Sequence, residues 1–192
     1  MNNLSTSKWK EFRDFTVERL KNVTVNWKPY WHVYIQDTLH PELFECTKTF
    51  WPKEDWVPNN TGLNPNRKVN RAWKDYVKNM MVHTDIQQAV YNLEGLEYSG
   101  DKKCMDGLYE DTIGYAVGNH VDGHVIQMAW QIYVTGETGT NINDKNGNLI
   151  KELPFKENCS WIMRNDDSNF HSCDTVKVLS RRSIMARFTT PA

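Results

Sequence analysis

The sequence has 192 residues, of which 39% are hydrophobic and 24% are charged, and its formal net charge is −1. Such a chain can bury a sizeable core without disulfides or a structural metal, and its near-neutral charge argues against a protein that works mainly by neutralising phosphates. None of the four cysteines forms a CxxC pair, residues 1–10 contain no apolar run, and no stretch approaches the roughly 20 apolar residues that span a bilayer. We therefore expect a cytoplasmic protein with free thiols and no membrane contact.

Helices and loops are predicted for the first 95 residues. Apolar residues recur at helical spacing in residues 5–23, and three candidate caps stand at the start of this helix: Ser5, Thr6 and Ser7. A short strand is predicted where apolar residues alternate with more polar ones, at Trp31, Val33 and Ile35. Prolines and asparagines punctuate residues 40–66, which predicts a long loop.

Two more helices are predicted before residue 95. The first covers residues 67–82 and carries a basic stripe at helical spacing, formed by Arg67, Arg71, Lys74 and Lys78. The second is capped by Thr84, runs to Leu93 and ends at Gly95.

After residue 95 the pattern changes to short strands separated by turns rich in Gly, Asn and Asp. The predicted strands are 112–117, 125–135, 161–165, 175–179 and 183–188, with a turn over 136–148. Helices followed by antiparallel strands indicate an α+β fold. We expect one domain over residues 1–192, in which a helical and loop part, 1–95, packs on a sheet formed mostly by 96–192.

The central motif is His120-Val121-Asp122. Residues i and i+2 of an extended strand point to the same face, so His120 and Asp122 can reach one metal ion, and His171 is the best candidate for a third ligand. Two imidazoles and one carboxylate on one face of an octahedron are typical of non-haem iron(II) oxygenases. A bare HxD with a later histidine also arises by chance, in surface loops for example. A zinc site built on His120 and His124 lacks the glutamate of HExxH.

The residues around these ligands carry a family resemblance. Gly114-Tyr115 precedes the HxD pair, a strand ends in Tyr133-Val134-Thr135, and Gly139-Thr140 and Arg181-Arg182-Ser183 follow in order. This arrangement, over about 80 residues, resembles the prolyl-hydroxylase-like branch of the 2-oxoglutarate/iron(II) dioxygenase superfamily. Two features depart from the family pattern: Asn119 stands where proline is common, and two adjacent arginines stand where one is needed.

The resemblance implies a double-stranded β-helix, a jelly-roll of two facing antiparallel sheets. It implies iron(II) held by His120, Asp122 and His171, with 2-oxoglutarate as co-substrate and ascorbate as a possible reductant. The activity implied is hydroxylation of a peptidyl proline or a small molecule, with release of succinate and carbon dioxide.

In this family an arginine on the last core strand pairs with the distal carboxylate of 2-oxoglutarate, because a guanidinium group matches a carboxylate bidentately. The resemblance selects Arg181, with Ser183 as a hydroxyl donor; Tyr133 is a further donor or a core aromatic residue. Arg182 is the alternative anchor. Strand parity places Arg181, Ser183, Met185 and Arg187 on one face of the last strand, and Arg182, Ile184, Ala186 and Phe188 on the other.

The sequence is compatible with two other functions. A cupin-like binding module would keep the barrel, with or without a metal, and would not turn over a substrate. A nucleic-acid-modifying oxygenase is suggested by the basic stripe, although a solvated helix face is the simpler interpretation.

Overall fold

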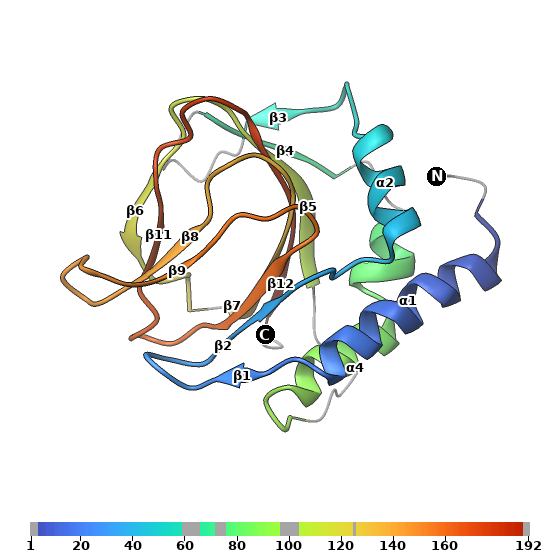
Figure 1. Ribbon diagram of the computed structural model, residues 1–192, viewed down its shortest axis with the longest axis horizontal. Helices are drawn as coiled ribbons and strands as arrows, with labels where there is room; N and C mark the ends of the chain where they lie inside the picture. Colours follow the sequence, from blue (N-terminus) through green and yellow to red (C-terminus); the bar gives the residue numbers. More distant parts are fainter. Residues whose placement is uncertain (1–3, 59–65, 72–75, 97–103, 125, 190–192) are drawn as a thin grey trace.

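Two antiparallel sheets and a layer of helices make up the computed structural model of this protein, which describes residues 4–58, 66–71, 76–96, 104–124 and 126–189 (Figure 1). The helical elements are α1 (Thr6–Lys21), α2 (Pro41–Thr49), a π-helical turn η1 (Val77–Met81) and α4 (Thr84–Asn92). The strands of the first half are β1 (Val25–Asn26), β2 (His32–Ile35), β3 (Val57–Pro58) and β4 (Arg67–Asn70). Those of the second half are β5 (Cys104–Asp111), β6 (Val117–His120), β7 (Ile126–Thr135), β8 (Thr140–Asn143), β9 (Leu149–Leu153), β10 (Ser160–Arg164), β11 (His171–Cys173) and β12 (Arg181–Thr189).

The major sheet has eight strands in the order β1-β2-β10-β7-β12-β5-β4-β3, and the minor sheet has four in the order β6-β11-β8-β9. The two sheets face each other across the barrel, and the helices lie together on its outer side (Figure 1). Four strands of the major sheet therefore come from the first 95 residues, where one short strand was expected besides the helices and loops.

Alternate side chains of β7 pack into two different cores, one on each side of the major sheet. Met128, Trp130 and Ile132 pack with the helices in the larger core, whereas Ala129 and Tyr133 lie in the smaller core between the sheets. Side chains alternate across a strand, so a strand covered on both faces is apolar throughout. The same alternation in β12 sends Ile184, Ala186 and Phe188 to the helices.

Several predicted elements are confirmed. Helix α1 begins after Ser5, whose hydroxyl group accepts a hydrogen bond from the Lys8 amide at 3.2 Å, and strands β2, β7, β10 and β12 lie within two residues of the predicted ranges. Helix α4 also forms as predicted, but its cap is His83, which accepts from the Asp85 amide at 3.3 Å, and not Thr84.

Other predictions were wrong. The loop expected over 40–66 contains α2, because Pro41 occupies the first helical turn, where its missing N–H costs nothing, and His40 caps that turn. Residues 67–70 form strand β4 and not the start of a helix, since pairing with β5 outweighs helical spacing. The basic stripe is therefore not a helix face; its Lys74 lies outside the described residues.

The strand boundaries in the second half also needed correction. Residues 112–116 form a turn between β5, which was not expected, and β6, and Gly114 has a φ of +88° in it. Residues 175–179 form no strand. The turn expected over 136–148 contains strand β8, which pairs with β9 around a short hairpin closed by Asp144 and Asn148. No helix in the described part of the chain is long and apolar enough to cross a membrane.

Candidate metal centre

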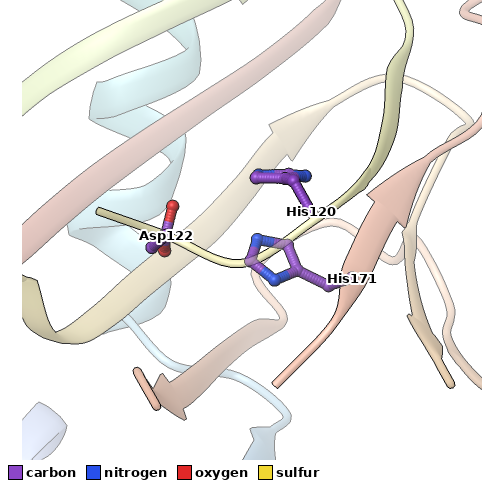
Figure 2. A group of neighbouring side chains, drawn as sticks. All are labelled: His120, Asp122 and His171. Atoms are coloured by element: carbon purple, nitrogen blue, oxygen red, sulfur yellow. The ribbon is translucent and has the colours of Figure 1, made fainter. Parts of the chain in front are cut away.

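His120, Asp122 and His171 lie next to one another and line the same pocket. Each offers one potential ligand atom, and these atoms all lie within 4.8 Å of one another. The two imidazole ring centroids are 4.3 Å apart, and Figure 2 shows the Asp122 carboxylate beside them. All three side chains are partly buried. The three residues selected from the sequence thus form one cluster.

The register of the minor sheet brings the histidines together. Strands β6 and β11 are antiparallel neighbours, and His171 lies directly opposite His120. Side chains opposite each other in such a pair point to the same face and have Cβ atoms about 5 Å apart. Asp122 follows β6 in the next loop, so its place depends on how that loop is held.

Asn165 holds the loop that carries Asp122. Its amide nitrogen lies 3.1, 3.0 and 2.9 Å from the backbone oxygens of Asp122, Gly123 and Ile126, and its backbone N–H donates to Gln127. These bonds tie the loop to the end of β10. A side chain that fixes the backbone beside a ligand limits the positions that the ligand can take.

Hydrogen bonds also fix the tautomer of both histidines. The Nδ1 atom of His120 lies 2.9 Å from the Gly118 carbonyl, and that of His171 lies 3.1 Å from the Asn169 carbonyl. A carbonyl oxygen only accepts, so each Nδ1 carries the proton and each neutral ring keeps its lone pair on Nε2. Burial lowers the pKa of His171, which favours the neutral ring.

This donor set fits a divalent transition-metal ion. Two neutral imidazole nitrogens and one carboxylate are the ligands that iron(II) takes in facial three-residue sites, whereas structural zinc usually has four protein ligands.

Two other candidate ligands lie outside this cluster. Exposed His124 lies 3.7 Å from the exposed carboxylate of Asp167, apart from the cluster. Cys173 is buried, its Sγ atom donates to the Asp174 carbonyl, and burial raises the pKa of this thiol.

The cluster opens into a pocket of about 60 Å³ between the two sheets. Arg181, Met185 and Arg187 from one face of β12 line it, as strand parity predicted. Arg67, Tyr115, Gln131, Thr140 and Trp161 complete much of the wall. The pocket therefore joins the three candidate metal ligands to several cationic side chains.

Asp111 lies between two arginines in this wall and is completely buried. Arg67 donates from Nε and Nη2 to its two oxygens at 2.6 and 2.9 Å. Arg181 donates to one of them from Nε at 2.9 Å, and its Nη2 lies 2.9 Å from the same oxygen as an ion pair. Arg181 also donates from Nη1 to the Gly139 carbonyl at 3.0 Å. Burial alone would lower the pKa of Arg181, but the carboxylate of Asp111 raises it overall. The group carries a net charge of +1.

The hydroxyl groups predicted to bind the co-substrate form hydrogen bonds with residues that line the pocket. Tyr133 donates to Thr140 at 2.9 Å and accepts from the Trp161 indole at 3.1 Å, while Ser183 accepts from Gln131 at 2.8 Å. Burial raises the pKa of Tyr133 to about 12, so this hydroxyl group keeps its proton at neutral pH. Both side chains support the pocket wall in this arrangement.

Arg182 lies on the other face of β12 and lines a different pocket. Arg187 lines the metal pocket, where its Nη1 donates to the Tyr109 hydroxyl at 3.1 Å and its guanidinium carbon lies 5.7 Å from the centre of that ring.

Sequence reasoning missed three contributors to this site: Arg67, Asp111 and Asn165. Arg67 was assigned to a helix, and nothing local in the sequence marks its pairing across the sheet with Asp111. Asn165 was only the end of a predicted strand, and its role depends on a loop about 40 residues earlier in the chain. No local pattern could have found these three residues.

No family model matches this sequence, and neither does any curated protein. Solved structures do match. An oxidoreductase of the 2OG-Fe(II) oxygenase family from Burkholderia pseudomallei superposes with a TM-score of 0.59 at 9% identity, over 92% of this chain and 89% of that one. The chain has the fold of the 2-oxoglutarate/iron(II) oxygenases.

Two further matches show how varied the proteins with this oxygenase fold are. A prolyl hydroxylase from Trichoplax adhaerens, in complex with a peptide fragment of hypoxia inducible factor, has a TM-score of 0.55 at 11% identity, over 97% of this chain and 94% of that one. The α-ketoglutarate-dependent epimerase SnoN of nogalamycin biosynthesis has a TM-score of 0.56 at 10% identity, over 92% and 81%. The predicted double-stranded β-helix with helices packed on one sheet is confirmed, and at these identities the likeness concerns the fold.

Proposed function

We propose that this protein is an iron(II)- and 2-oxoglutarate-dependent oxygenase that hydroxylates a peptidyl proline or a small molecule. One observation carries the proposal: His120, Asp122 and His171 share a pocket with a buried wall of net positive charge. Such a pocket pairs a metal site with an anion site, which is what a metal-chelating dianion requires. Solved structures with this fold include an oxidoreductase of the 2OG-Fe(II) oxygenase family and a prolyl hydroxylase, and both support the same function.

In this proposal the Nε2 atoms of His120 and His171 and the carboxylate of Asp122 hold iron(II). Dioxygen is the oxidant: with iron(II) bound, one of its oxygen atoms would enter succinate as 2-oxoglutarate loses carbon dioxide, and the other would enter the hydroxylated substrate. The Nδ1–H bonds of the two imidazoles leave each Nε2 lone pair free for the metal, and Asn165 holds the Asp122 loop. These contacts preserve the ligand geometry while the remaining metal positions stay open to the co-substrate.

Arg181 is the proposed anchor for the distal carboxylate of 2-oxoglutarate. Two guanidinium groups share the single carboxylate of Asp111, so the wall keeps one positive charge without a balancing anion in the group. A buried unbalanced charge is costly, and an incoming carboxylate relieves that cost. Binding of 2-oxoglutarate need not displace Asp111, because Arg67 and Arg181 together offer more N–H donors than the Asp111 carboxylate can accept. Direct donation by Tyr133 and Ser183 stays a prediction.

The experiment is succinate formation from 2-oxoglutarate, with iron(II) and ascorbate supplied. His120→Ala and Asp122→Ala should abolish it, and manganese(II) binding measured calorimetrically should weaken at least 100-fold in both variants. The matched control is His124→Ala, which removes an exposed imidazole outside the cluster and should change neither result.

Arg181→Met tests the anchor separately, because its KM for 2-oxoglutarate should rise while manganese(II) affinity is kept. Full activity in the His120 and Asp122 variants would contradict the metal assignment. Metal binding without any succinate would instead favour a cupin-like binding module.

A further inference from the structure

A second pocket lies on the outer face of the major sheet, at the edge where α2 ends. It has a volume of about 400 Å³, and six of its side chains carry the argument: Lys48, Trp51, Lys53, Trp56, Lys68 and Arg182. None of these residues belongs to the metal pocket.

Strand pairing in the major sheet places two rows of charged side chains on opposite faces of the sheet. Arg67 and Arg181 both lie opposite Asp111 in register, and the next residues, Lys68 and Arg182, both lie opposite Glu110. Because side chains alternate across a strand, the first row faces the barrel and the second faces outward. The outer row of Lys68, Glu110 and Arg182 thus repeats on the surface the charge pattern of the buried row.

The outer pocket has a surplus of positive charge. Four of the residues that line it are cationic, and Glu110, 3.5 Å from the Arg182 guanidinium, is the acidic one. Lys48 pairs with Glu157 at 2.7 Å. Within the described part of the chain, Lys53 and Lys68 are exposed and have no carboxylate within ion-pair distance. A concave surface that gathers cations on a chain of net charge −1 attracts anions.

Aromatic rings stand beside these cations. Trp51 stacks on Trp56 with ring centroids 5.9 Å apart and an interplanar angle of 30°, and the Arg182 guanidinium lies 5.7 Å from the Trp51 ring. The Trp56 indole donates to the Pro52 carbonyl at 3.0 Å, which fixes its ring. Trp56 is only partly buried, so it can extend the stack to a planar ligand in the pocket.

We propose that the outer pocket binds a nucleotide, with its phosphate on Lys53, Lys68 and Arg182 and its base against Trp56. Phosphate is bound by clustered cations, and a base stacks on an aromatic ring. Either a free nucleotide or a nucleotide within a single strand carries this chemistry. The site is separate from the metal pocket and does not depend on the oxygenase activity.

The test is calorimetric titration of the full chain with AMP, with inorganic phosphate and with a six-nucleotide oligothymidylate. AMP should bind more tightly than phosphate, and Lys53→Gln/Lys68→Gln should weaken AMP binding at least 10-fold. Trp56→Leu should bring AMP affinity down to that of phosphate. The control is Lys10→Gln, an exposed lysine of α1 paired with Asp14, which should change nothing.

The oligonucleotide distinguishes the two sources. At least 10-fold tighter binding than AMP, falling steeply with salt, points to a single strand; equal or weaker binding points to a free nucleotide. The proposal is overturned if neither nucleotide binds, or if the lysine double variant, whose exposed side chains are not needed for folding, binds both as the unaltered chain does. Equal affinity for AMP and phosphate would overturn the nucleotide assignment.

Discussion

Asp111→Asn removes a buried negative charge from between two guanidinium groups. Four N···O contacts of 2.6 to 2.9 Å, three of them hydrogen bonds, converge on the Asp111 carboxylate from Arg67 and Arg181. Asparagine keeps the shape of the side chain but replaces one acceptor oxygen with a donor, which then faces the N–H groups of an arginine. The buried group changes from a charge of +1 to +2.

The expected loss in the free energy of unfolding follows from the burial of Asp111 and Arg181. Asp111 is 0% exposed and Arg181 is 2% exposed, so water does not screen the loss. Removing one partner of a buried ion pair typically lowers the free energy of unfolding by about 3–5 kcal/mol. For a chain of this size, that corresponds to a Tm lower by roughly 6–20 °C.

Urea unfolding followed by circular dichroism measures the loss. The matched control is Glu110→Gln, the neighbouring carboxylate on the outer face, which lies 3.5 Å from Arg182 and is 20% exposed. Its loss should lower the free energy of unfolding by less than about 1 kcal/mol. If Asp111→Asn lowers stability no more than this control does, the buried charge group does not stabilise the fold as argued.

Three further outcomes are expected. The buried ring of His32 donates from Nδ1 to the Tyr30 carbonyl and accepts from Lys151 at Nε2, and burial lowers its pKa. The unfolded chain therefore binds the proton first, so the free energy of unfolding should fall as the pH drops below about 6.5. Urea unfolding from about pH 7.5 to about pH 5 measures this fall, which should be shallower in His32→Gln. Asn165→Ala frees the Asp122 loop and should weaken manganese(II) binding about 10-fold by calorimetry; unchanged affinity would refute its role. Gly139→Ala would place a Cβ 2.9 Å from the Phe155 nitrogen and against the Leu153 carbonyl, so it should lower the Tm by several degrees, whereas Gly118→Ala, with open space around it, should not.

Local patterns predicted much of the frame of this protein. Apolar spacing identified α1, because a buried helix face requires regular spacing whatever the partner is. Signals for a helix start and end identified α4, and the turns around it identified the long strand β7. The elements that were missed depend on context. Helix α2 begins with a proline, β4 has too few residues for a period, and β8 has a polar sequence whose strand form comes from pairing with β9.

The candidate site divides in the same way. The sequence by itself determined the ligand types, and it determined which residues of β12 share a face, because side chains alternate along a strand. It did not determine the place of Asp122, which lies in the loop after β6 that Asn165 holds. Only the tertiary structure decided that His171 lies opposite His120, that Arg181 faces the metal pocket and Arg182 the outer one, and that Asp111 joins Arg67 to Arg181. Those contacts join segments 44 to 70 residues apart in the chain, and strand register, which local sequence does not encode, brings them together.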